Sequence, residues 1–97
     1  MKIINQRRLA DFVVNHADSI KAINKWAETL ASGSFKQPYD LLKVFPSADY
    51  VGNDRYVFDI KGNKYRIIAI ILFVGEIIDV RFVGTHAEYS KINSKTV

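Results

Sequence analysis

Apolar residues between positions 5 and 33 recur with the spacing of two amphipathic helices. In the first segment, residues 5–16, one helical face carries side chains at i, i+3, i+4 and i+7: Leu9, Phe12, Val13 and His16. In the second segment, residues 18–33, the stripe has a tryptophan beside it: Ile20, Ile23, Trp26, Ala27, Leu30 and Ala31. A short break separates the two segments, so the pattern predicts a helical hairpin.

Polar residues and a glycine predict where these helices begin and end. Asn5 is placed to cap the first helix and Asp18 to cap the second. Gly33 stands where a helix C-terminus favours a left-handed residue. Met1–Ile4 precedes the first helix and predicts a short strand. We interpret His16 as a packing or helix-end residue rather than a catalyst. We interpret four basic residues as a solvated helix surface more than as an RNA-contacting one: Arg7, Arg8, Lys21 and Lys25.

After Pro38 the pattern changes to that of strands. Proline breaks helices, so we expect Pro38 to stop any helix and Pro46 to end a short strand over 41–45. A turn-rich stretch follows, and then come three strand-like runs over 55–60, 64–74 and 77–83. Tight turns at 61–63 and 75–76 connect the three runs. Such short connections favour an antiparallel meander.

The longest run, residues 64–74, is apolar on both faces after Arg66. One face carries Tyr65, Ile67, Ala69, Ile71 and Phe73, and the other carries Lys64, Arg66, Ile68, Ile70, Leu72 and Val74. We therefore expect a central strand covered on both sides, with Lys64 and Arg66 together at its start. In the last run the same alternation predicts two sets: Ile77, Asp79, Arg81 and Val83 on one face, and Ile78, Val80 and Phe82 on the other. Arg81 can be interpreted as the partner of Asp79 or as a functional side chain.

Composition narrows the class of protein. The chain of 97 residues has the size of a single domain, which we place over residues 1–97. It has no cysteine and only two histidines, far apart in sequence, so we expect no disulfide, no metal site and no cofactor. No segment approaches the roughly 20 apolar residues of a membrane span, and no signal peptide is evident. We expect a cytoplasmic protein whose net charge of +4 is compatible with a polyanionic partner.

The stretch "RFVGTHAEYSK", residues 81–91, places several polar groups where the last strand ends. Thr85 and Glu88 form the T-x-x-E pattern of a helix capping box, so a short helix should display His86, Tyr89 and Lys91. In an antiparallel pair the start of one strand lies beside the end of its neighbour. The hairpin would therefore bring Arg66 and Lys64 to the same edge as this helix.

This combination of cations, an imidazole and a phenol suits the cleavage of RNA by its own 2′-hydroxyl. Such cleavage needs a base for the hydroxyl proton, a cation for the phosphate charge and an acid for the leaving 5′-oxygen. Arginine offers a fork for phosphate oxygens, and histidine exchanges protons near neutral pH. The residues alone are weak evidence for this chemistry, and they also allow a structural interpretation, in which Arg66 and His86 are ordinary residues at a sheet edge.

The run from "FKQPYDLLKVFPSAD" to "GNKYRIIAIILF", followed by "VRFVGTHAEYSKI", resembles the HigB family of RelE-like toxins. The resemblance implies an α+β fold: an N-terminal helical hairpin packed on a small twisted antiparallel sheet, with a short C-terminal helix. It implies a ribosome-dependent mRNA endoribonuclease, or mRNA interferase, that works in the ribosomal A site without a metal. It also implies a helix-turn-helix antitoxin of the HigA type, with operator DNA bound only through the toxin–antitoxin complex.

The same resemblance assigns roles to individual residues. Arg66 matches the arginine expected to stabilise the scissile phosphate, His86 a C-terminal basic catalytic group, and Tyr89 an aromatic residue that stacks or assists proton transfer. Lys64, Arg81 and Lys91 are candidate RNA contacts. The strand "YVFDI" departs from RelE because it has Asp59 where RelE has paired lysines. His86 is therefore our first candidate for the general base and Tyr89 the second.

Two other interpretations remain open for the chain. A non-catalytic RNA- or ribosome-binding module of the same fold would also explain the basic edge, and the missing lysines in "YVFDI" favour it. A purely structural or dimerising domain would need no chemistry at all.

Overall fold

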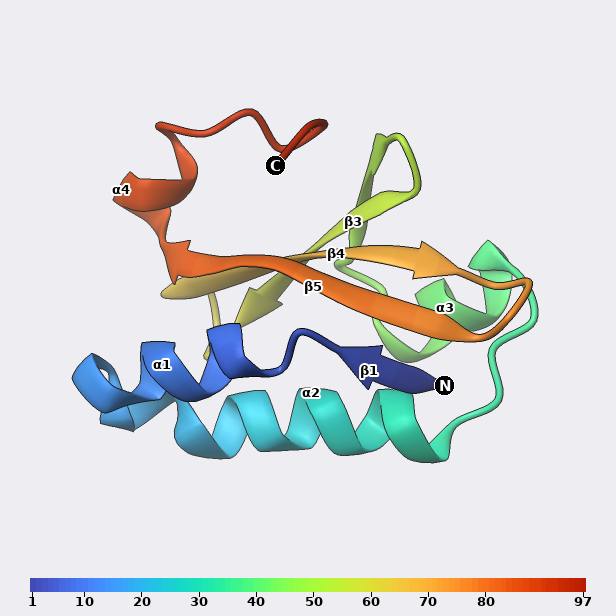
Figure 1. Cartoon of the computed structure of the whole chain (residues 1–97), viewed down its shortest axis with the longest axis horizontal. Coiled ribbons are helices and arrows are strands. Elements are labelled where there is room, and N and C mark those ends of the chain that lie inside the picture. Colours follow the sequence, from blue (N-terminus) through green and yellow to red (C-terminus); the bar gives the residue numbers. More distant parts are fainter.

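The computed structural model describes residues 1–97 and is built around one five-stranded sheet (Figure 1). The strand order is β1-β5-β4-β3-β2, in which β2 to β5 form an antiparallel meander and β1 pairs with β5 in parallel. The strands are β1 (Lys2–Ile4), β2 (Asp49–Gly52), β3 (Arg55–Ile60), β4 (Tyr65–Leu72) and β5 (Ile77–Thr85). The helices are α1 (Arg7–Asn15), the 3₁₀ turn η1 (Ala17–Ser19), α2 (Ile20–Ser32), α3 (Pro38–Val44) and α4 (His86–Tyr89).

The predicted α+β class, the helical hairpin, the meander and the short C-terminal helix are confirmed. Figure 1 shows α1 and α2 on one side of the sheet, while α4 and the segment after it lie on the other. The parallel strand β1 pairs only with Ile77, Ile78 and Asp79 of β5. The rest of β5 has no strand on that side, and α1 lies against it instead. None of the helices combines the length and the hydrophobicity that a membrane-spanning helix needs.

The main core lies between the sheet and α2. From β4 it takes Ile67, Ala69 and Ile71, which are almost fully buried, as the alternation along this strand predicts. Trp26 of α2 packs edge-on against Phe58 of β3, with ring centroids 5.4 Å apart. On the other face of the sheet only two apolar residues are buried, Val57 and Ile68, and neither belongs to this core. The central strand is thus covered on both sides, but thinly on the face away from the helices.

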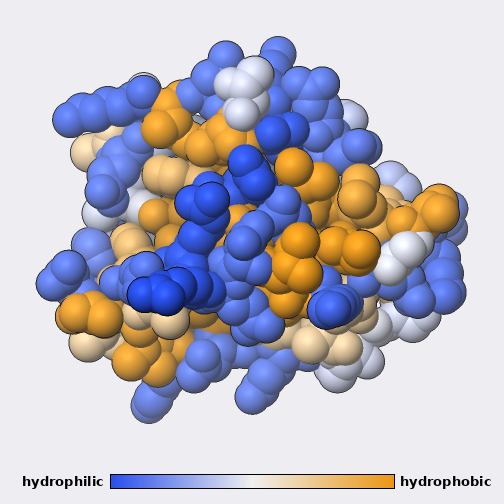
Figure 2. Space-filling view, viewed as in Figure 1, coloured by the Kyte–Doolittle hydropathy of each residue, from blue (hydrophilic) through white to orange (hydrophobic).

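Hydrophobic residues also reach the surface. Figure 2 shows them gathered where β1 and the β4–β5 hairpin lie, surrounded by hydrophilic residues. Leu72 and Val74 at the tip of the hairpin are among these exposed side chains. The tip of the hairpin and α4 lie at opposite ends of β5 (Figure 1).

A bulge in β5 reverses the predicted alternation of its last residues. Ile68 pairs with Phe82 while the next residue, Ala69, pairs with Val80, which leaves Arg81 without a partner on β4. Phe82 therefore shares a face with Ile68, and Val83 packs against the core. The prediction that Val83 lies with Arg81, and Phe82 with Val80, was wrong because one inserted residue shifts the side-chain period by one.

The segment around Pro38 also differs from the prediction. It forms a helix, α3, rather than a strand, because Pro38 occupies the first helical turn, where its missing N–H costs no hydrogen bond. Leu41 on this helix is fully buried. The turn-rich stretch after Pro46 contains the edge strand β2, which the sequence pattern did not indicate.

The helix boundaries follow different chemistry from that predicted. Asn5 does not cap α1: it has a positive φ of 59° and donates its side-chain N–H to Asp79. Asp18 does not cap α2 but turns toward β4. Gly33 has an extended backbone, with φ −83°, rather than the predicted left-handed one. Glycine fits here because a Cβ atom would clash with the ring of Phe35. Two residues of the predicted stripe on α2 are exposed, Ile20 and Ala31.

Candidate functional site

Arg66 of β4 lies between β3 and β5, on the face of the sheet away from the helices. It stands opposite Asp59 of β3 on one side and Gly84 of β5 on the other. Its Nε lies 3.2 Å from Asp59 Oδ1 but is not aligned for a hydrogen bond, so the contact is an ion pair only. Its guanidinium carbon lies 4.6 Å from the centroid of the Tyr89 ring, within cation–π range. The structure therefore brings two of the three predicted catalytic residues into contact.

The short helix α4 is fixed to the end of β5 by the predicted capping box. Thr85 Oγ1 accepts a hydrogen bond from the Glu88 N–H at 3.2 Å, and Glu88 Oε1 accepts one from the Thr85 N–H at 2.8 Å. The Thr85 N–H holds the pKa of the Glu88 carboxyl below its usual value of 4.5. Because Thr85 pairs with Tyr65 in the sheet, this cap places Tyr89 over the neighbouring Arg66.

His86, the third predicted catalytic residue, begins α4. Its Nε2 lies 2.8 Å from Oδ1 of Asn63, in the turn between β3 and β4. An amide oxygen only accepts, so Nε2 donates, and in the neutral ring Nδ1 is left to accept a proton. Asn63 thus orients the imidazole and selects its tautomer. The sequence signal for Asn63 was the turn "KGN", which was recognised only as a hairpin connection.

Of the predicted RNA contacts, Lys64 lies away from Arg66. Its Nζ donates to Asp18 at 2.6 Å, and the hydroxyl of Tyr65 donates to the same carboxylate at 2.6 Å. These two hydrogen bonds lower the pKa of Asp18 to about 2. The expectation that Lys64 shares a face with Arg66 was wrong, because Lys64 precedes the strand and does not follow its alternation. The other two candidates, Arg81 and Lys91, lie on β5 and just after α4.

Arg81 forms the ion pair that its spacing indicated. Its Nη1 donates to Asp79 at 3.2 Å, and its Nε donates to the main-chain oxygen of Val97 at 3.4 Å. Lys91 is exposed. Arg81 is partly buried, with 32% of its side chain exposed.

A polar cavity of about 350 Å³ lies beside Arg66. Its lining comes from β2, β3, β4 and the turn before β2: Pro46, Ser47, Ala48, Asp49, Val57, Asp59 and Arg66. The sequence analysis considered Asp59 only as the residue that stands where RelE has paired lysines. The hairpin register could have revealed it, because a turn over 61–64 sets residue 60 opposite residue 65, and residue 59 opposite residue 66. The cavity gives a phosphate room to approach the guanidinium.

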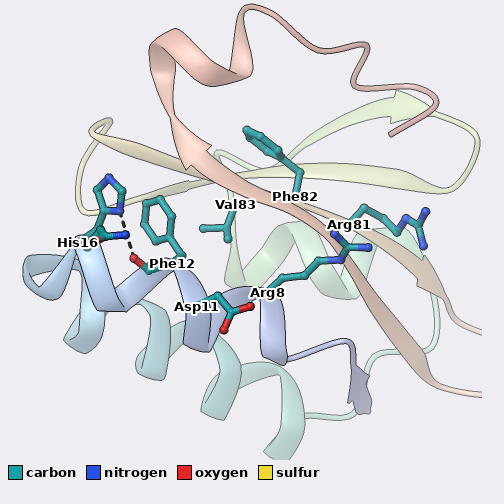
Figure 3. Close-up of a pocket in the computed structure, with 8 residues that line it drawn as sticks. Arg8, Asp11, Phe12, His16, Arg81, Phe82 and Val83 are labelled. Atoms are coloured by element: carbon teal, nitrogen blue, oxygen red, sulfur yellow. Dashed lines mark hydrogen bonds between the residues drawn. The ribbon is translucent and has the colours of Figure 1, made fainter.

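A second cleft, of about 390 Å³, lies between α1 and β5 (Figure 3). Figure 3 shows Arg8 extending from α1 toward the strand, with Phe82 pointing to the far side of it. His16 closes one end: its Nδ1 donates to the Phe12 carbonyl oxygen at 3.1 Å, and its ring stacks on that of Phe12 at 4.0 Å. His16 is therefore engaged in packing, as its place on the apolar stripe predicted. Residues 1–97 contain no group of three or more side chains positioned to bind a metal ion.

Comparison with known proteins gives a consistent result. A family model described as "HigB_toxin, RelE-like toxic component of a toxin-antitoxin system" matches residues 19–92. The "mRNA interferase toxin HigB" of Escherichia coli K12 is 35% identical over 92 residues, which are 92% of this chain and 88% of the relative. The same figures hold for the "mRNA interferase HigB" of Shigella flexneri. Another protein of that name, from Escherichia coli O6:H1, is 29% identical over 94 residues, 95% of this chain and 91% of the relative.

Proposed function

This chain belongs to the HigB family of RelE-like toxins, the toxic components of toxin–antitoxin systems, and from this premise we propose that it is an mRNA interferase that cuts translated mRNA in the ribosomal A site. The observation that carries the proposal is the contact of Arg66 with Tyr89, one helical turn from His86, beside an open polar cavity. The 2′-hydroxyl of the RNA attacks the adjacent phosphate, and no metal takes part.

Arg66 stabilises the charge that develops on the phosphate. Its Nε is buried beside Asp59, and its two terminal nitrogens make no hydrogen bond within the chain, so these can donate to phosphate oxygens. The ring of Tyr89, stacked on the guanidinium, restricts its orientation, and Asp59 holds Nε at one side. The fork is thus positioned before RNA binds, which lowers the cost of ordering it in the transition state.

His86 acts on the proton of the attacking 2′-hydroxyl. Asn63 holds Nε2–H, so Nδ1 is the nitrogen that accepts the proton. Tyr89 either stacks on a base or protonates the leaving 5′-oxygen. Lys91 and Arg81 contact flanking phosphates, whereas Lys64 is held by Asp18 on the helix side and is not included.

A site with so few proton-transferring groups depends on an external scaffold to align its substrate, and the ribosome supplies that alignment. The activity would therefore take place in the cytoplasm, on mRNA that is being translated. Membership of a toxin–antitoxin family implies an antitoxin partner. We propose that this antitoxin is a helix-turn-helix protein of the HigA type, and that the chain meets operator DNA only through it.

A non-catalytic RNA- or ribosome-binding module is the second candidate. The ion pair of Arg66 with Asp59 favours it, because the carboxylate reduces the positive charge that the guanidinium offers to a phosphate. Such a module would slow translation without producing new RNA 5′ ends.

The test is to map 5′ ends on a message translated in vitro with the purified chain. Arg66→Ala should reduce the cleavage rate by about 10²–10³-fold, as for loss of one group that stabilises transition-state charge. His86→Ala should reduce it by at least about 10²-fold, through loss of proton transfer. Arg7→Ala is the matched control, because Arg7 is an exposed arginine of α1 on the helix side of the sheet.

Each variant must first give the circular dichroism spectrum and melting temperature of the parent. If Arg66→Ala and His86→Ala then cut translated mRNA as fast as Arg7→Ala, the assignment of the site is wrong. If no variant, nor the parent, produces new 5′ ends while translation slows, the binding module replaces the nuclease.

A further inference from the structure

Three charged side chains lie in a row across β2, β3 and β4, on the face of the sheet away from the helices. Asp49 of β2 pairs with Val57 of β3. Two residues farther along β3, Asp59 pairs with Arg66 of β4. Residues that pair across strands, or lie two apart on one strand, point to the same face. All of these side chains line the polar cavity of about 350 Å³, in which Val57 is the buried apolar member.

The two carboxylates of this cavity have oxygen atoms that bind nothing within the chain. Asp59 contacts Arg66 through Oδ1, and its Oδ2 makes no hydrogen bond. Asp49 is exposed and takes part in no ion pair and no side-chain hydrogen bond. Carboxylate oxygens only accept hydrogen bonds. The end of the cavity formed by β2 and β3 therefore offers acceptors to a ligand that carries N–H groups.

The charges of the cavity also separate the parts of a nucleotide. A phosphate is attracted by the terminal nitrogens of Arg66 and repelled by the carboxylate of Asp49, so it stays at the Arg66 end. The Asp49 end favours a neutral group with hydrogen-bond donors instead. In RNA, the neutral group that the ribose joins to a phosphate is the base.

The position of Asp59 connects the two ends of the cavity. Its Oδ1 lies 3.2 Å from Arg66 Nε, whereas its Oδ2 remains available to a ligand. A base that donates to Asp59 would therefore contact the residue that holds the phosphate-binding guanidinium. Recognition of the base and binding of the phosphate are coupled through this one carboxylate.

We propose that this cavity is a base-binding subsite, in which Asp49 and Asp59 accept hydrogen bonds from a nucleobase with an exocyclic amino group. Its volume of about 350 Å³ lies at the lower end of the range for small-molecule pockets, which suits a single base. The proposal rests on the proposed function, because the base belongs to the RNA whose phosphate lies at Arg66. It deepens that function by giving the site a preference among nucleotides.

The chemistry of the acceptors sets this preference. Adenine, cytosine and guanine each carry an amino group, whereas uracil presents two carbonyl oxygens with one N–H between them. A carbonyl oxygen that faces a carboxylate is repelled and leaves an acceptor without a partner. A site built to accept hydrogen bonds therefore rejects an otherwise similar ligand that lacks the donor. We expect the subsite to disfavour uracil.

The first experiment compares the binding of two RNAs that differ only in their bases. Short oligomers of cytidine and of uridine with 2′-O-methyl groups cannot be cut, and fluorescence anisotropy gives their Kd values. The two bases are of equal size, but cytosine has an amino group where uracil has a carbonyl. The parent should bind the cytidine oligomer about tenfold more tightly, as for a hydrogen bond to a charged acceptor.

Asp49→Asn is the variant that tests the subsite. The amide of asparagine donates as well as accepts, so it can pair with a carbonyl of uracil. The preference for cytidine should therefore fall from about tenfold to about twofold. Asp54→Asn is the matched control, because it removes the same charge from the exposed turn between β2 and β3, outside the cavity. Asp54→Asn should keep the preference of the parent.

The second experiment maps cuts on translated messages, where the ribosome positions the RNA. At one fixed position relative to the cut, uracil should be about tenfold rarer than cytosine for the parent and for Asp54→Asn. For Asp49→Asn the two bases should occur there with similar frequency. The melting temperature of each variant is measured first, so that only folded proteins are compared.

The two proposals fail in different ways. If the parent cuts translated mRNA but neither experiment distinguishes uracil from cytosine, the base subsite is wrong and the nuclease stands. The subsite is also wrong if Asp49→Asn retains the same preference as Asp54→Asn. If the oligomers show the preference and Asp49→Asn removes it, while the parent cuts no message, the subsite belongs to a binding module and the nuclease is wrong.

Discussion

The two faces of the sheet are made from alternate residues of the same strands, yet they differ in almost every physical property. On β4, Ile67, Ala69 and Ile71 point into a continuous core beneath α2. Their neighbours Arg66 and Ile70 point to the other side, where two ion pairs and few buried apolar groups lie. One strand thus contributes to stability with every second residue and to a candidate binding surface with the others.

This division explains how so small a chain can expose a cluster of charges. The apolar area that a single domain buries on one face provides most of its free energy of folding. The other face can then hold arginines that pair with carboxylates, as Arg66 does with Asp59 and Arg81 with Asp79. The comparison predicts that substitutions on the two faces affect different measured quantities.

The largest expected effect is on stability, from Ile67→Ala on the core face. Ile67 is fully buried, so its truncation should lower the free energy of unfolding by about 2–5 kcal/mol in chemical denaturation. Ile70→Ala is the matched control, because it lies on the same strand but half exposed on the other face. Ile70→Ala should lower the free energy of unfolding by clearly less than Ile67→Ala does. Equal losses for the two variants would show that the open face is as important for folding as the core.

The sequence predicts the core face well because its signal is local and redundant. The period of two along residues 64–74 and the helical stripe with Trp26 each indicate buried positions independently, and the structure confirms most of them. A single error does not change the result there. The capping box at Thr85 was also predicted, because both of its partners lie within four residues.

The open face is less predictable because its contacts join residues far apart in sequence. The bulge at Arg81 adds only one residue, yet it places Phe82 and Val83 each on the face opposite to the one predicted. The ion pair of Lys64 depends on Asp18, which is 46 positions away. Arg55 meets Arg81 only through a segment that crosses the sheet. None of these follows from periodicity or from a short motif.

The next prediction concerns α4, which belongs to the open face. Thr85→Ala removes the capping hydroxyl and should cost about 1 kcal/mol of stability, much less than Ile67→Ala. It should lower the rate of mRNA cleavage more than this cost suggests, because Tyr89 then loses its fixed position over Arg66. Thr85→Ser keeps the hydroxyl and should behave like the parent in both assays. If Thr85→Ala cuts at the parent rate, the position of Tyr89 does not matter for the reaction.

The smallest effect that separates the faces is expected in acid, at Asp18 on the helix side. Lys64 and Tyr65 lower the pKa of Asp18 to about 2 from 3.8, so the ionised carboxylate is favoured by folding. Its stabilising contribution is therefore complete above about pH 4 and disappears as the pH falls toward 2. Asp18→Asn should reduce the melting temperature at neutral pH and flatten its fall between pH 4 and 2.

Because Lys64 and Tyr65 are engaged on the helix side, the same variant should cut translated mRNA normally at neutral pH. Asp11→Asn, which removes an exposed carboxylate paired only with Arg7, should retain the acid dependence of the parent. A loss of cleavage in Asp18→Asn with unchanged melting would mean that Lys64 leaves Asp18 to act at the site beside Arg66, and that the two faces are not independent.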